Sequence, residues 1–203
     1  MRLVIATHNA KKAGEMRQIL QERFPALEIR DLSAYPEAPE PEETGTTYAE
    51  NATIKALSAV EATGEWCVAD DAGLEIDALD GAPGLHSKRF EGADTDFPTK
   101  MARILELLRD VPEDRRGARF RCCVALARPG GLCETLEATC EGRIAEAPAG
   151  RGGFGYDPIF FAVDAGRHMA ELTPEEKHAV SHRGKVLRAL SQRLEELLPP
   201  TSP

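Results

Sequence analysis

The chain has 203 residues, 42% of them hydrophobic, and a formal net charge of −9 from 34 acidic and 25 basic residues. This length predicts one large domain or two lobes that share a core. The acidic balance argues against a general nucleic-acid-binding protein, because such proteins normally carry a basic stripe or patch. The sequence has no apolar run near the roughly 18 to 20 residues of a membrane span, so we expect no membrane partner.

The N-terminal segment and the cysteines both favour a cytoplasmic protein. The apolar residues at 3–6 are too few for a signal peptide, since the polar segment 7–12 cuts them short. The five cysteines are odd in number and form no CxxC pair. Most of them lie among apolar residues, where a free cysteine behaves as a small hydrophobic side chain. A reducing compartment is the simplest interpretation.

Predicted strands and helices alternate in the first half of the chain. Apolar runs at 3–6 and 66–69 predict buried strands, and 28–31 predicts a more exposed one. We expect Asp70-Asp71-Ala72-Gly73 to stop the strand at 66–69 abruptly. Helical spacing of apolar side chains predicts three helices: one with apolar residues between 16 and 24, one over 46–63, and one with apolar residues between 101 and 108.

A hairpin and two capped helices are predicted in the second half. Strands are expected at 120–127 and 132–144, joined at 129–131, and a short strand at 159–161. Thr173-Pro174-Glu175-Glu176 has the composition of a capping box with proline at the first helical position. Ser181 can cap a final helix that carries leucines on one face.

These elements favour the α/β class, with a mixed β-sheet flanked by helices. We expect a single domain over residues 1–198 and a frayed tail over 199–203. A Pro- and Glu-rich loop at 33–45 has no core of its own.

Cations at two predicted helix starts give the first indication of chemistry. Lys11 and Lys12 open the first helix, and His182 and Arg183 open the last one. A helix N-terminus carries partial positive charge and prefers acidic neighbours, so these cations make sense if an anion is bound there. The loop that starts at Thr7 lacks the glycines of a Walker A sequence, so its polar side chains would have to supply donors. The alternative is that the lysines are simply solvated.

The adjacent carboxylates Asp70 and Asp71 give the second indication. Two carboxylates in a cleft raise each other's pKa unless a cation lies between them. Mg²⁺ typically takes one or two protein carboxylates and completes its shell with water and substrate phosphates. Glu43, in the long loop, is a further candidate ligand. A polar turn with both aspartates solvated is the alternative.

The glycine-rich segment Gly152-Gly153-Phe154-Gly155-Tyr156-Asp157 gives the third indication. Glycines around an aromatic residue let the backbone turn tightly and present a ring face to a ligand. A base stacked on Phe154 would gain about 1–3 kcal/mol. Alternatively, Phe154 or Tyr156 packs into the core. Lys55 and Lys177 are open to both interpretations, as site residues or as ordinary lysines.

Together these residues resemble the Ham1-like family of noncanonical purine nucleoside-triphosphate pyrophosphatases. The matching segments run along almost the whole chain in the order and spacing of the family. They are Ala6 to Lys12, Glu43 to Gly45, Glu50 to Ala56, Ala69 to Leu74, Gly81 to Gly84, Gly152 to Pro158, Glu171-Leu172 with Glu176-Lys177, and Ser181 to Gly184.

The resemblance implies a role for each segment. The loop made of Thr7, His8, Asn9, Ala10, Lys11 and Lys12 would wrap the triphosphate, with Lys12 and Lys55 against phosphate oxygens. Asp71 would be the catalytic base and a Mg²⁺ ligand, with Glu43 as a further ligand and Asp70 in support. Phe154 would stack on the base, and the nucleoside pocket would be completed by Gly155, Tyr156 and Asp157. The purine edge would meet Lys177, His182 and Arg183.

The implied reaction is Mg²⁺-dependent hydrolysis of ITP, dITP and XTP to the monophosphate and pyrophosphate, which cleanses the nucleotide pool. A 6-oxo purine accepts hydrogen bonds where adenine cannot, and a donor left unpaired by adenine is penalised heavily. The family fold is an elongated mixed α/β structure of two lobes with the active site in the cleft between them, and it usually forms a homodimer. Ala72 departs from the usual serine or threonine, which removes a hydroxyl contact.

Two other functions remain open at this stage. A related pyrophosphatase for pyrimidine or modified nucleotides would share the sheet and the metal site. A regulatory protein that holds a nucleotide without hydrolysing it is the second. The pair Asp70-Asp71 argues against it, because a pure binder gains little from two carboxylates beside a triphosphate.

Overall fold

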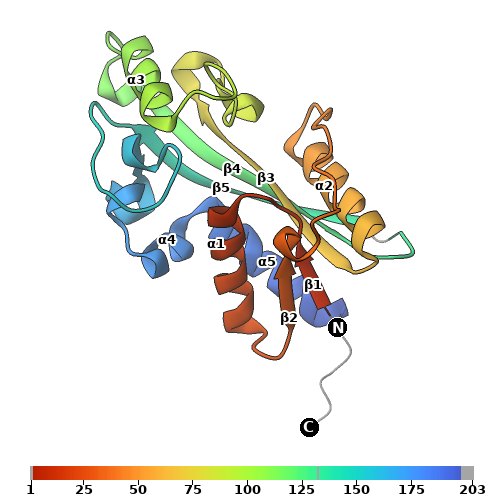
Figure 1. Ribbon diagram of the computed structural model, residues 1–203. Helices are drawn as coiled ribbons and strands as arrows, with labels where there is room; N and C mark the ends of the chain where they lie inside the picture. The colour runs from red at the N-terminus through yellow and green to blue at the C-terminus, as the bar shows by residue number, and fades with distance from the viewer. Residues whose placement is uncertain (1, 132, 198–203) are drawn as a thin grey trace. The chain divides into compact units, whose positions relative to one another are not determined.

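The computed structural model describes residues 2–131 and 133–197 (Figure 1). The chain divides into two compact units. Unit 1 consists of the described parts of 1–71, 122–138 and 183–203, and unit 2 consists of 72–121 and 139–182. The expected frayed tail lies outside the described residues, and the expected placement of a site between two lobes stays a prediction.

The strands form a mixed sheet in the order β2-β1-β3-β4-β5-β6-β7, which confirms the predicted class. β1 pairs in parallel with β2 and β3, whereas β5–β6 and β6–β7 are antiparallel. Registers include Leu3 opposite Ile29 and Trp66, and Arg143 opposite Phe161. The strand bounds are β1 Arg2–Ile5, β2 Glu28–Asp31, β3 Trp66–Ile76, β4 Gly117–Ala127, β5 Cys133–Ile144, β6 Phe160–Ala162 and β7 Arg167–His168.

Unit 1 contains the helices α1 (Ala10–Arg23) and α2 (Tyr48–Thr63) and most of α5 (His182–Leu197). The predicted helical spacing is confirmed, since Met16 and Leu20 of α1 are fully buried. α2 begins with a capping box at Thr47 and ends at Gly64, whose φ of 68° is the left-handed conformation that glycine adopts without strain. One core cluster of this unit consists mostly of small side chains: Val4, Ala6, Leu32, Ala38, Ala52, Ala56, Ala59, Cys67, Ala69, Ala125 and Ala127.

Unit 2 holds α3 (Phe97–Leu107) and α4 (Pro174–Val180). α4 has the capping box that the sequence predicts, with Thr173 at the N-cap and Glu176 at the third helical position. Its core cluster includes Leu74, Ile104, Tyr156 and Phe160. No helix in the described part of the chain is long and apolar enough to cross a membrane.

The expected end of the third strand is wrong. β3 continues as one strand through Asp70-Asp71-Ala72-Gly73 to Ile76. Aspartates disfavour strands because their side chains compete for backbone hydrogen bonds and are costly to bury. Both carboxylates are paired with cations, which offsets part of that cost. A smaller correction is that β6 begins at Phe160, because Ile159 ends a short 3-10 turn. Lys177 lies within α4.

Candidate active site

The loop from β1 into α1 is shaped by its own polar side chains. The N–H of Asn9 donates to Thr7 Oγ1 at 3.2 Å, and Asn9 Oδ1 accepts from the N–H groups of Lys11 and Lys12 at 3.0 and 3.1 Å. Asn9 is thus the N-cap of α1 and uses its oxygen as an acceptor, where the sequence suggested a donor. Three further predicted residues are exposed here: His8, Ala10 and Lys11.

Lys12 turns from this loop toward a buried aspartate. Its Nζ lies 3.3 Å from Asp70 Oδ1 and 3.2 Å from Oδ2. Arg183, at the start of α5, donates to Asp70 Oδ2 through Nε at 3.2 Å and through Nη2 at 2.9 Å, and its Nη1 donates to Glu15 Oε2 at 2.8 Å. Arg183 is 3% exposed. The anion that compensates Arg183 is therefore a carboxylate of the protein itself.

This arrangement keeps Asp70 charged inside unit 1. Burial by itself raises the pKa of the Asp70 carboxyl, but Lys12, Arg183 and Lys55 outweigh it and hold that pKa well below its usual range. Asp70 also raises the pKa of Arg183 against the opposing effect of burial. A buried ion pair of this kind is costly to break, because removal of one partner leaves an uncompensated charge.

Asp71 has different partners. Its Oδ1 accepts from Lys55 Nζ at 3.1 Å, and its Oδ2 accepts from Asn51 Nδ2 at 3.3 Å. Lys55 Nζ also donates to Glu43 Oε1 at 2.8 Å, so two carboxylates converge on one ammonium group. Consecutive side chains of a strand point to opposite faces, which separates the partners of Asp70 from those of Asp71. The expected metal cation between the two aspartates stays a prediction.

The pKa of Asp71 moves in the opposite direction from that of Asp70. Burial raises it, and the nearby charge of Glu43 raises it further, while Lys55 and Lys12 act against both. The pKa of Lys55 is raised because Asp71, Asp70 and Glu43 outweigh the effect of burial. A carboxylate whose pKa is raised toward neutrality is a better proton acceptor than an ordinary aspartate.

Glu43 and Asp71 fit the demands of a magnesium ion. Both offer carboxylate oxygens to one point, now taken by the Lys55 ammonium, and Mg²⁺ needs only one or two protein carboxylates. A larger cage is not present: the described residues contain no group of three or more His, Cys, Asp or Glu side chains with the geometry of a metal site. The remaining ligands would have to come from water and substrate.

The glycine-rich segment of unit 2 is folded around Asp157. Asp157 Oδ2 accepts from the N–H of Phe154 at 2.8 Å and from Lys177 Nζ at 2.7 Å. Gly153 has a φ of 68°, and a Cβ there would lie 2.0 Å from Asp157 Oδ2, so only glycine allows this close approach. Lys177 Nζ lies 4.5 Å from the centroid of the half-buried Phe154 ring, in the geometry of a cation–π contact.

The other predicted residues of unit 2 are more deeply packed. Tyr156 is 3% exposed, and its hydroxyl donates to the carbonyl oxygen of Ser87 at 2.8 Å, so Tyr156 belongs to the core. Burial raises the pKa of its phenol. His182 is buried and stacks on Phe120 with ring centroids 4.8 Å apart. Ala72 lies half-buried in β3, and Gly155 is half-buried in the turn before Tyr156.

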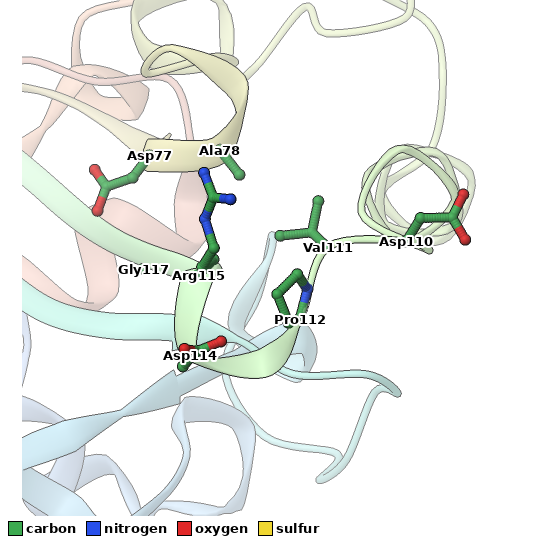
Figure 2. Close-up of a pocket in the computed structure, with 8 residues that line it drawn as sticks. All are labelled: Asp77, Ala78, Asp110, Val111, Pro112, Asp114, Arg115 and Gly117. Atoms are coloured by element: carbon green, nitrogen blue, oxygen red, sulfur yellow. The ribbon is translucent and has the colours of Figure 1, made fainter.

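A pocket of about 460 Å³ in unit 2 lies among none of these residues. Figure 2 shows the Arg115 side chain extending toward the turn that carries Asp77 and Ala78. The lining mixes acidic, basic and apolar side chains, and Arg119 pairs with Asp77 at 3.0 Å. The lining residues are Asp77, Ala78, Asp110, Val111, Pro112, Asp114, Arg115 and Gly117.

Comparison with known proteins decides the family. The model of the Ham1 family matches residues 3–193. The chain belongs to the Ham1 family. It is similar to the dITP/XTP pyrophosphatase of Geobacillus kaustophilus, with 46% identity over 97% of this chain and 95% of that protein. It is similar to the dITP/XTP pyrophosphatase of Streptomyces coelicolor, with 46% identity over 97% and 98% of the two chains.

Solved structures of the Ham1 family agree with the fold. The structure of a HAM1 protein from Coxiella burnetii has a TM-score of 0.86 and 38% identity, over 97% of this chain and 99% of that one. A nucleoside-triphosphatase / dITP/XTP pyrophosphatase from Mycobacterium abscessus has a TM-score of 0.73 and 44% identity, over 94% and 98% of the two chains.

The sequence predicts no role for three residues that contact the aspartates or Arg183. Asn51 donates to Asp71, Glu15 accepts from Arg183, and the Sγ of Cys122 lies 3.9 Å from Asp70 Oδ2. Asn51 was detectable, because it precedes Lys55 by four residues and shares its helix face. Glu15 and Cys122 carried no such signal, since their contacts join distant parts of the chain.

Proposed function

We propose that this chain hydrolyses noncanonical purine nucleoside triphosphates, namely ITP, dITP and XTP, to the monophosphate and pyrophosphate. The observation that carries the proposal is Asp71, a buried carboxylate with a raised pKa between Lys55 and Asn51, in a chain whose relatives are dITP/XTP pyrophosphatases. The chain is a hydrolase of phosphoric anhydrides, and its role is to remove these nucleotides from the pool.

Unit 1 supplies the phosphate chemistry. Asp71 accepts a proton from the attacking water, whose oxygen forms a bond to the α-phosphorus. The bond from that phosphorus to the bridging oxygen breaks, and pyrophosphate leaves with the electron pair. Lys12 and Lys55 stabilise the negative charge that builds up on the phosphate oxygens. Asp70, held charged by Arg183, keeps Lys12 in place.

Magnesium is the cofactor that fits this arrangement. Glu43 and Asp71 would hold it, with Lys55 shifting from the position between their carboxylates toward phosphate oxygens. When bound, Mg²⁺ polarises phosphoryl oxygens and offsets their charge. The homodimer implied by the family resemblance and the cytoplasmic location favoured by the cysteines stay predictions.

Unit 2 supplies the nucleoside chemistry. Phe154 offers a half-buried ring for stacking, and Lys177 lies beside it with an ammonium that is a hydrogen-bond donor. A 6-oxo group accepts a hydrogen bond from such a donor, whereas the 6-amino group of adenine cannot accept it. Through the resemblance we assign the same recognition role to His182 and, from unit 1, to Arg183, both of which are buried.

The test is a substrate panel with pyrophosphate detection. The purified protein with Mg²⁺ should release pyrophosphate from ITP, dITP and XTP far faster than from ATP, GTP or pyrimidine nucleotides. Asp71→Asn should lower kcat by about 10²–10⁴-fold, the usual contribution of a general base, while far-UV circular dichroism stays unchanged. Orthophosphate as the sole inorganic product would rule out attack at the α-phosphorus, and tight ITP binding without turnover would favour a regulatory nucleotide-binding protein.

A further inference from the structure

Lys100 of α3 is a buried cation that is not one of the predicted active-site residues. The side chain is 1% exposed. Its Nζ donates to the carbonyl oxygen of Lys88 and lies 5.2 Å from the centroid of the Phe97 ring. Asp96, the N-cap of α3, attracts it electrostatically. Burial of an ammonium group is costly unless its neighbours compensate it, so a lysine where a methionine would fill the same space points to a role for the charge.

The contacts of Phe97 lead from Lys100 to the glycine-rich segment. The Phe97 and Tyr156 rings meet edge to face, with centroids 5.2 Å apart and planes at 88°. The ring atoms of Phe97 are also the nearest neighbours of a Cβ placed on Gly155, at 3.6 and 3.8 Å. The ring that Lys100 holds therefore lies against both residues that follow Phe154.

A second path joins Lys100 to the same segment through the backbone at Ser87 and Lys88. Tyr156 donates to the carbonyl oxygen of Ser87, and Lys100 donates to the next carbonyl oxygen along the chain, that of Lys88. The Ser87 hydroxyl accepts from the N–H of Leu74 at 2.9 Å and donates to the carbonyl oxygen of Gly84 at 2.6 Å. The Ser87-Lys88 backbone is thus fixed from three sides.

We propose that Lys100 is a positioning residue for nucleoside recognition. It holds the Phe97 ring and the backbone at Ser87-Lys88, which together fix Tyr156 and Gly155 and so set the orientation of Phe154. This inference rests on the proposed function, in which Phe154 stacks on the base. Loss of the Lys100 charge should therefore loosen the base pocket, while the carboxylates and lysines of unit 1 keep their positions.

Steady-state kinetics of Lys100→Met with ITP test the proposal. We expect KM to rise by about 5- to 20-fold with kcat within about twofold of the wild type. A merely structural role would give the opposite split, because partial unfolding lowers the active fraction and hence kcat without changing KM. The matched control is Arg109→Met, because Arg109 follows α3 and its side chain is exposed; this variant should leave both constants unchanged. An unchanged KM for Lys100→Met overturns the proposal.

Hydrogen exchange provides a readout that does not depend on turnover. In Lys100→Met, a peptide covering 151–160 should exchange faster than in the wild type, because the hydrogen bonds between Phe154 and Asp157 lose their support. If Lys100→Met does not fold, Phe97→Leu replaces it as the test, because this variant removes the ring but keeps an apolar side chain. It should likewise speed the exchange of the peptide 151–160. Unaltered exchange in the folded variant overturns the inference. A wild type that neither binds nor hydrolyses ITP contradicts the proposed function instead.

Discussion

Asp70 and Asp71 are neighbours in sequence but differ in their electrostatic environment. Asp70 contacts two cations and has a lowered pKa, whereas Asp71 shares one lysine with Glu43 and has a raised pKa. Adjacent carboxylates with pKa values moved apart can serve different roles, one as a permanent charge and the other as a proton acceptor. The sequence alone gave no means of telling them apart beyond the family resemblance.

Substitutions in the Asp70–Arg183 ion pair test whether Asp70 is a permanent buried charge. Arg183→Met should lower the free energy of unfolding by roughly 3–5 kcal/mol, because it leaves the Asp70 carboxylate buried beside Lys12 alone. Asp70→Asn in the same chain should recover part of that loss, since the amide needs no counter-charge. Urea unfolding of both variants measures the effect, with the exposed Arg188→Met as control. Additive losses in the double variant would show that the two side chains are not coupled.

Helix α2 is the element that organises the surroundings of Asp71. Asn51 and Lys55 are four residues apart, share one face of the helix and contact the two oxygens of the same carboxylate. Asn51 Oδ1 also accepts from the N–H of Gly45, which fastens the end of the acidic loop that carries Glu43. The start of α2 is fixed in turn by the capping box at Thr47.

Gly45 lies so close to the start of α2 that a larger side chain has no room. A Cβ there would lie 2.6 Å from Asn51 Oδ1 and 2.9 Å from the backbone N of Asn51, so the loop would have to move. Gly45→Ala should therefore lower kcat/KM for ITP by about tenfold or more, because displacement of a catalytic group by about 1 Å has effects of this size. Gly14→Ala on α1, where a Cβ meets nothing within 4 Å, is the matched control. Equal kinetics for the two variants would show that the loop at 43–45 does not position Glu43.

The same elements show how far the sequence predicted the structure. Local signals identified the helices, since apolar spacing, the caps at Thr173 and Gly64 and the hairpin glycines act within a few residues. The continuation of β3 through Asp70 was missed because its compensating charges come from Lys12 and Arg183, which are 58 and 113 positions away. A pattern within one segment carries no information on partners at that separation.

For the whole molecule, the paired carboxylates determine how stability responds to acid. A lowered pKa in the folded state contributes stability at pH values above the unfolded-state pKa, and that stability is lost as the pH falls toward the folded-state value. Asp70 is the buried case, and the pKa values of exposed carboxylates such as Glu28 and Glu50 shift in the same direction. Asp71, with its raised pKa, has the opposite sign and costs stability at neutral pH.

Acid should therefore destabilise the protein below about pH 4, the usual range of an unfolded aspartate. Asp70 alone should contribute a slope of about 1.4 kcal/mol per pH unit there, because the unfolded chain binds one more proton than the folded one. Urea unfolding at pH 7, 5, 4 and 3 measures this slope, and Trp66, the single tryptophan of the chain, reports on unit 1 by fluorescence. Asp70→Asn should flatten the curve relative to the wild type and to Asp110→Asn, an exposed control. Parallel curves for all three proteins would show that Asp70 does not remain charged in the fold.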